Sequence, residues 1–155
     1  MRKRHVTMMF AVLATVAFAA TSLSAQENPR FGVWKMKSDA PPPQSNIMTY
    51  APWGNNGMSI VVASVNRNGD KNEWGYETEF DGEFRPVEGQ QGSATAVEVV
   101  DDRTTRISNR RDGHVYQVII NVLSEDGNTI ENEYIRFDDD GKVTSVGHAT
   151  YERIR

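Results

Sequence analysis

Two histidines outside the N-terminal segment, His114 and His148, have the most scope for acid-base or metal chemistry. Imidazole titrates near neutral pH and is a common metal ligand. His114 follows an Asp-Gly turn and is expected to lie in solvent. His148 shares a strand face with Val146 and Thr150 and could point into a cavity. A metal site needs further ligands, which no spacing here supplies. We therefore predict no metal site and keep His148 as a candidate ligand-binding residue.

Other residue types that carry chemistry form no recognisable site. The acidic runs Asp138–Gly141 and Glu125–Asn128 bring oxygen atoms together but do not match a calcium-binding EF-hand loop. The chain has no cysteine, which excludes thiol catalysis and thiolate metal sites. No Gly-x-Ser-x-Gly motif places a nucleophilic serine. We predict no catalytic residue, no cofactor and a protein that is not an enzyme.

Four arginines could meet an anionic ligand if they point inward. They are Arg106, Arg110, Arg111 and Arg136. Pairing with surface carboxylates is the competing interpretation, and it is the one we favour.

The first 25 residues have the three-part pattern of a secretory signal peptide. A basic start, Arg2 to Arg4, precedes an apolar run from Val6 to Ala20 and a small-residue segment that ends at Ala25. The apolar run is short for a membrane span of about 20 residues. We expect cleavage after Ala25, a secreted or periplasmic bacterial protein, and no integral membrane segment in the single domain formed by residues 26–155.

Removal of that segment makes the protein distinctly acidic. Three of the 17 lysines and arginines but none of the 21 acidic residues lie in the first 25 positions, so residues 26–155 carry a net charge of −7. Phosphate backbones repel such a chain. We therefore expect no nucleic-acid partner. The oligomeric state is not predicted.

Composition after Gln26 favours strands over helices. A single leucine, Leu123, stands against 13 valines and 8 isoleucines, and β-branched residues suit a pleated sheet. Breakers divide the chain into about ten predicted strands, at 31–37, 45–50, 58–66, 72–80, 84–88, 95–101, 104–111, 114–124, 129–138 and 143–154. We expect almost no helix.

Short turns separate these predicted strands. Five of the turns contain an Asx-Gly dipeptide, at 68–69, 81–82, 112–113, 126–127 and 140–141. Two-residue hairpin turns favour Asn-Gly and Asp-Gly because they need positive φ. Short links join only antiparallel neighbours, so the order is an up-and-down meander, and closing it into a barrel removes the exposed edges. The proline-rich segment 38–45 is expected to be a stiff spacer or cap.

Period-two alternation identifies candidate ligand-contacting residues. In 72–80, one face carries Trp74, Tyr76, Thr78 and Phe80, whereas the other face carries Glu73, Glu77 and Glu79. In 114–124, Tyr116 alternates with Val118, Ile120 and Val122. Aromatic side chains of this kind can line a cavity inside a barrel. The candidate ligand-binding set is Trp74, Tyr76, Phe80, Tyr116, Tyr134 and His148.

The two ends of the predicted barrel carry a family resemblance. Gly32-Val33-Trp34 on the first strand and Thr150-Tyr151-Glu152-Arg153 on the last resemble the calycin group, which includes lipocalins and fatty-acid-binding proteins. The chain also resembles small exported bacterial proteins described as lipocalin-like. The resemblance implies an all-β antiparallel meander closed into a lipocalin-like barrel. It implies that Gly32, Trp34 and Arg153 close one end, with the guanidinium on the indole.

The sequence also departs from the calycin pattern. Ala149 occupies the position of the arginine that fatty-acid-binding proteins use with a tyrosine to bind carboxylate, and the proline-rich link replaces their helical lid. Lipocalins usually have eight strands and a C-terminal helix, whereas this chain ends in a predicted strand. The leading interpretation is a barrel that binds a small hydrophobic or amphipathic molecule. The alternative is a non-enzymatic envelope or interaction protein that uses the barrel as a scaffold without an internal ligand.

Overall fold

The computed structural model describes residues 27–155, so the predicted signal peptide lies outside the described residues. These residues form ten strands and no helix, which confirms the all-β prediction. The strands are β1 (Gly32–Met36), β2 (Ser45–Trp53), β3 (Gly57–Val65), β4 (Lys71–Thr78), β5 (Arg85–Pro86), β6 (Ser93–Val99), β7 (Thr104–Arg111), β8 (His114–Leu123), β9 (Thr129–Phe137) and β10 (Val143–Arg153).

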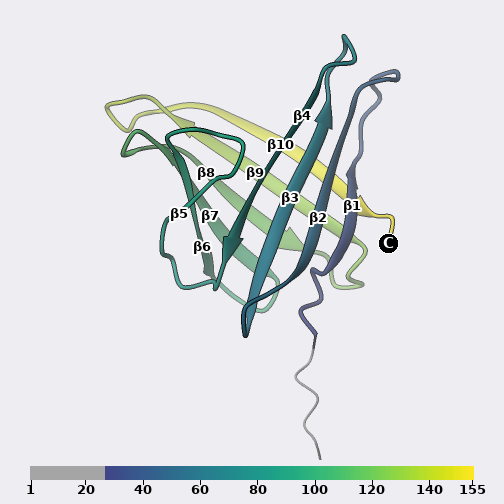
Figure 1. Ribbon diagram of the computed structural model, residues 1–155, viewed down its shortest axis with the longest axis horizontal. Helices are drawn as coiled ribbons and strands as arrows, with labels where there is room; N and C mark the ends of the chain where they lie inside the picture. Colours follow the sequence, from purple (N-terminus) through teal and green to yellow (C-terminus); the bar gives the residue numbers. More distant parts are fainter. Residues whose placement is uncertain (1–26) are drawn as a thin grey trace, which may run out of the picture.

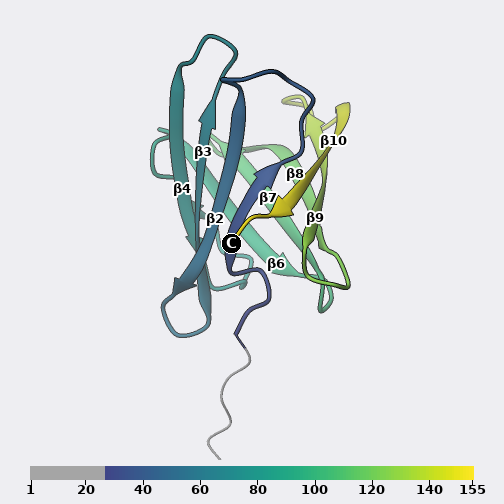
Figure 2. The same cartoon turned by 90° about the vertical axis from the view of Figure 1, so that its right-hand side faces the viewer.

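All ten strands belong to one antiparallel sheet that curls into a nearly closed barrel. Its order is β4-β3-β2-β1-β10-β9-β8-β7-β6-β5, an up-and-down meander in which β1 pairs with β10. In Figure 1, β2, β3 and β4 cross in front of the fainter β7, β8 and β9, and Figure 2 shows the same wall from its side. The barrel prediction is therefore confirmed.

A short seam between β4 and β5 completes the barrel. Gly75 exchanges two backbone hydrogen bonds with Glu88, of 3.1 and 2.8 Å. Nearer the end of β4, the Gly82 amide donates to the Val97 carbonyl at 3.0 Å. Two isolated bridges thus take the place of a continuous ladder.

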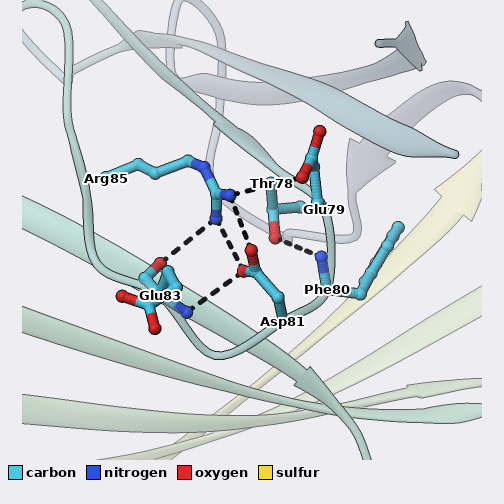
Figure 3. A network of polar contacts seen from close by, with 6 residues as sticks. All are labelled: Thr78, Glu79, Phe80, Asp81, Glu83 and Arg85. Carbon is cyan, nitrogen blue, oxygen red and sulfur yellow. Dashed lines mark hydrogen bonds and ion pairs between the residues drawn. The ribbon is translucent and has the colours of Figure 1, made fainter. Parts of the chain in front are cut away.

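Side chains in the β4–β5 connection hold this seam (Figure 3). Both terminal nitrogens of Arg85 donate to the Asp81 carboxylate at 2.7 Å. The Arg85 hydrogen bonds and the Glu83 amide keep the pKa of Asp81 well below its usual range. Phe80 enters the connection with a φ of 61°, and its amide donates to the Thr78 hydroxyl at 2.9 Å. The connection is therefore an ordered turn and not a hairpin.

The Asx-Gly turns differ in detail from the prediction. All five glycines have positive φ, but among the paired Asn and Asp residues only Asp112 does, at 50°. Only 112–113 is thus a two-residue turn with both central residues at positive φ, linking the pair Arg111–His114. The turns at 66–70, 124–128 and 138–142 are longer, and their glycine amides donate back to Asn66, Ser124 and Asp138.

The barrel has two distinct ends. The 37–44 link and the turns at 66–70, 112–113 and 138–142 lie at what we call the open end. Residues 27–31 and the turns at 54–56, 100–103 and 124–128 lie at the opposite end, which we call the floor. In both views the described chain begins below the floor, while the 37–44 link lies at the top beside β1 and β2 (Figures 1 and 2). The link contains a cis Pro42–Pro43 peptide bond.

Trp34 is the centre of the floor. Its side chain is 0% exposed, and its indole nitrogen donates to the Arg30 carbonyl at 2.9 Å. The Arg153 guanidinium carbon lies 4.1 Å from the ring centroid, so the structure places a cation on the indole. Gly32 allows this close approach because a Cβ there would lie 2.6 Å from Arg153 Nη1, at a φ of 141° that other residues rarely adopt.

The strand predicted at 45–50 extends three residues further in the structure. β2 continues to Trp53, where Pro52 pairs with Met58 of β3. Its other neighbour, β1, pairs only as far as Tyr50, through Gly32. Pro52 therefore needs no amide hydrogen bond on that side, and the strand tolerates it.

Candidate functional site

A cavity of about 260 Å³ lies inside the barrel between its two walls. Strands β2 to β4, strands β6 to β10 and the segment between β5 and β6 contribute its lining. The volume is just below the range of about 300–1,000 Å³ that is usual for drug-sized ligands. The barrel is therefore hollow, with room for a compact molecule.

The wall formed by β2 to β4 and the segment after β5 is apolar and aromatic. Trp74 and Tyr76 are its largest members, and their rings lie 6.2 Å apart and only 13° from parallel. Its members are Met48, Tyr50, Ile60, Val62, Trp74, Tyr76 and Val87. Contact with this wall would favour an apolar or aromatic ligand surface.

The opposite wall, on β7 to β10, is rich in amides and phenols. Asn109 donates to Gln117 at 3.0 Å, and Asn132 donates to the Tyr134 hydroxyl at 3.1 Å. The Tyr134 and Tyr151 hydroxyls are 3.5 Å apart. All five residues line the cavity. Amide groups that can form hydrogen bonds are therefore concentrated on this wall, whereas the opposite wall is mainly apolar and aromatic.

The buried phenols in and beside this site are neutral. Burial raises the pKa of Tyr76 well above its ordinary value and also raises the pKa values of Tyr50 and Tyr151. Each hydroxyl therefore keeps its proton at neutral pH and acts as a hydrogen-bond donor or acceptor.

Below the cavity, Arg30 inserts a buried cation into the floor. It is 5% exposed, and its Nε donates to Asn121 Oδ1 at 3.2 Å while Nη2 donates to the Arg103 carbonyl at 2.5 Å. Burial lowers the pKa of Arg30, and the Asp101 carboxylate acts in the opposite direction. Asn121 in turn donates to Asn132 Oδ1 at 2.8 Å. The floor cation is thus joined to the polar wall.

Cationic side chains also stand at the upper part of the cavity. Arg136 contributes to its lining. Arg111 lies over the Tyr116 ring at 5.3 Å and donates from Nε to the Ser93 hydroxyl at 3.3 Å. The other two candidate arginines lie elsewhere, since Arg106 pairs with Glu98 and Arg110 stacks over Phe84 at 4.2 Å. The open end therefore carries positive charge beside an aromatic ring.

Four of the six predicted ligand-contacting residues line the cavity together: Trp74, Tyr76, Tyr116 and Tyr134. Tyr116 reaches it through a register shift opposite Asn109 and Arg110, which leaves Tyr116 without a β7 partner. Such a bulge can redirect a side chain. Val118, Ile120 and Val122, which the alternation grouped with Tyr116, do not line the cavity. Gln117 and Ile119 line it instead.

Phe80 and His148 are not brought into the cavity. Phe80 lies beyond the end of β4 and lines a depression outside the floor. His148 is exposed on the outer face, where its two ring nitrogens are 3.0 Å from Glu131 and 3.2 Å from Glu133. Its neighbours Gly147 and Ala149 take the inward positions, because they pair with the cavity residues Tyr134 and Asn132. The inward placement considered for His148 is therefore wrong.

The depression outside the floor is a weaker candidate site. It measures about 670 Å³ and is lined by loop residues that include Phe31, Trp53, Phe80 and Asp101. It is more open to solvent than the interior cavity. A ligand there would stay largely hydrated, whereas binding sites usually bury most of the ligand surface.

Two features are absent from residues 27–155. No group of three His, Cys, Asp or Glu side chains in this range is arranged to hold a metal ion. None of these residues forms an apolar helix of the length that a membrane crossing requires.

Several polar residues in and below the cavity are not among the predicted ligand-contacting residues. Asn46, Gln117 and Asn132 line the cavity, and Asn121 and Arg30 extend their network to the floor. A signal was present in β8, where Gln117 and Asn121 alternate with valine and isoleucine. Polar residues on a face that also carries Ile119 and Leu123 indicate inward amides that need partners.

Comparison with solved structures shows that other proteins share this barrel fold at low sequence identity. Wild-type fluorescent protein UnaG matches with a TM-score of 0.54 at 12% identity, over 79% of this chain and 96% of UnaG. Fatty-acid-binding protein 1 of Echinococcus granulosus matches with a TM-score of 0.55 at 12% identity, over 82% and 98% of the two chains. The chain matches no protein-family model and no curated protein. The calycin-like architecture suggested by its sequence ends is confirmed.

Proposed function

We propose that this protein binds a small hydrophobic or amphipathic molecule inside its barrel and catalyses no reaction on it. The observation that carries the proposal is the cavity of about 260 Å³ with one aromatic wall and one hydrogen-bonding wall. Its lining contains no histidine, aspartate, glutamate or lysine. Acid-base catalysis would need such groups within reach of the ligand. The fatty-acid-binding protein among the structural matches is consistent with a binding role.

Blocking the open end should abolish binding. Gly147 faces inward beside Tyr134, and a Cβ there would meet no atom closer than 4.0 Å. The backbone should therefore accept a side chain in Gly147→Trp. The new indole should fill the space near Tyr134 and Arg136. We expect the wild-type protein to bind one equivalent of a hydrophobic fluorescent probe in a titration, and the variant to bind it at least about tenfold more weakly.

A matched control is available one residue away. Val146 is 59% exposed and pairs with Ile135 on the outer face, so Val146→Trp adds the same ring outside the barrel. Probe affinity should stay at the wild-type value in this control. Equal affinities in all three proteins would place the probe elsewhere, and no binding by the wild type would favour the scaffold alternative.

We also propose that the protein is exported, with residues 1–25 as its signal peptide. The proposal rests on the basic start, the short apolar run and the small residues before Gln26. Full-length protein expressed in a bacterial host should appear in the periplasm or medium with Gln26 as its first residue, as measured by intact mass. Uncleaved protein in the cytoplasm or the membrane fraction would contradict it.

A further inference from the structure

We infer that the ligand is a compact aromatic molecule with carbonyl or carboxylate oxygens along one edge. This inference rests on the proposed binding function and deepens it by naming the ligand's chemistry. The direction of the hydrogen bonds among the polar residues decides whether the cavity presents donors or acceptors.

Arg30 sets that direction at the floor. A guanidinium can only donate hydrogen bonds, so Asn121 must turn its oxygen toward Arg30 Nε, at 3.2 Å. The Asn121 amide nitrogen then faces Asn132 Oδ1, at 2.8 Å. This fixes Asn132 in turn, and its nitrogen donates upward to the Tyr134 hydroxyl at 3.1 Å. Each amide therefore accepts from below and donates toward the open end.

The contacts continue beyond Tyr134 through two hydroxyls, either of which can donate to the other. The Tyr134 hydroxyl lies 3.5 Å from that of Tyr151, which donates to Asn46 Oδ1 at 3.4 Å. Asn46 therefore turns its nitrogen, and not its oxygen, away from Tyr151. The NH2 group of Asn46 is therefore left free of this contact.

A second chain of hydrogen bonds ends in the same way. Thr95 donates to Asn109 Oδ1 at 2.7 Å, and Asn109 donates to Gln117 Oε1 at 3.0 Å. Within residues 27–155, no hydrogen bond uses the side-chain nitrogens of Asn46 or Gln117, yet no buried side-chain polar atom there lacks a partner. Both nitrogens therefore reach accessible space, and both residues line the cavity.

The polar wall thus offers N–H donors, and Arg136 adds a cationic donor at its upper part. A ligand that supplies oxygen acceptors satisfies them, whereas a hydrocarbon would displace water from them without replacement. The parallel rings of Trp74 and Tyr76 on the other wall favour an aromatic body. The volume of about 260 Å³ favours a compact ligand over a long acyl chain.

Three molecules that differ in aromatic character and in oxygen acceptors test the inference on the purified protein. They are 2-acetylnaphthalene, the similarly shaped hydrocarbon 2-isopropylnaphthalene and palmitate, each titrated against the bound fluorescent probe. Apolar burial alone would favour the hydrocarbon, because it has no polar group to desolvate. We expect instead that the ketone binds about tenfold more tightly than the hydrocarbon and more tightly than palmitate.

A variant without the Gln117 N–H group separates the contribution of hydrogen bonding from that of ligand shape. Gln117→Met keeps a side chain of similar length without an N–H group and should reduce the preference for the ketone several-fold while the probe still binds. Asn72→Met, at an exposed position of β4, is the matched control and should keep the preference. Circular dichroism melting verifies that each variant is folded.

The possible results distinguish the inferred ligand class from the proposed binding function. Wild-type protein that binds the probe but prefers the hydrocarbon or palmitate overturns the ligand class and leaves the binding function intact. A ketone preference that Gln117→Met leaves unchanged also overturns the inference, because the wall's donor would then play no part. Protein that binds neither the probe nor any of the three molecules contradicts the proposed function itself.

Discussion

Replacing Trp34 with alanine should lower the free energy of unfolding by about 3–5 kcal/mol, the usual cost of truncating a fully buried tryptophan. Trp34 is 0% exposed and packs under the barrel, so alanine leaves a cavity in the floor. The change also removes the donor to the Arg30 carbonyl and the ring beneath the Arg153 guanidinium. Urea unfolding followed by circular dichroism measures the loss.

Trp34→Phe is the control that separates the packing of the ring from the hydrogen bond of the indole N–H. It keeps most of the ring and loses the indole N–H, so it should cost less, about 1–3 kcal/mol from the unpaired Arg30 carbonyl and the smaller side chain. A loss below about 1 kcal/mol for Trp34→Ala, or equal losses for the two variants, would show that the floor does not depend on packing around this indole.

The strands could be predicted because their signals are local. Turn glycines and β-branched runs set the limits of β7 and β8 to within a residue. β5 was predicted at 84–88 but has only two paired residues, Arg85 and Pro86. The length of β5 depends on how far the barrel closes around the β4–β5 seam. No local sequence pattern indicates the extent of this closure.

The inward face of β10 could not be read from its own residues. Val146, His148 and Thr150 form one alternating set, and Gly147, Ala149 and Tyr151 form the other, with no contrast in polarity to decide between them. A shift of one residue exchanges the two faces. Pairing with Tyr134 and Asn132 decides it, and these are contacts with another strand.

Arg30 was missed for a related reason. It precedes β1 in a segment without alternation, and its partners Arg103 and Asn121 are 73 and 91 residues away. An arginine before a strand is normally solvated. Only closure of the barrel encloses its guanidinium, so its role follows from tertiary structure.

Asn121→Leu should destabilise the protein by about 2–5 kcal/mol, although leucine has the same branching and number of side-chain heavy atoms as asparagine. Asn121 is 1% exposed, and its amide is the acceptor for Arg30 Nε and the donor to Asn132. Leucine would leave a buried cation and a buried amide oxygen each short of a partner. The loss is measured by urea unfolding, as for Trp34.

The double variant Arg30→Met/Asn121→Leu distinguishes unpaired groups from lost packing. Once the cation is also gone, the floor holds two apolar side chains in contact, and replacing both partners of a buried polar pair is often nearly neutral. The double variant should therefore be more stable than Asn121→Leu alone, with a coupling of about 1–3 kcal/mol in the cycle. Additive losses would mean that Arg30 and Asn121 do not depend on each other. The direction of the amides in the cavity wall would then need another cause.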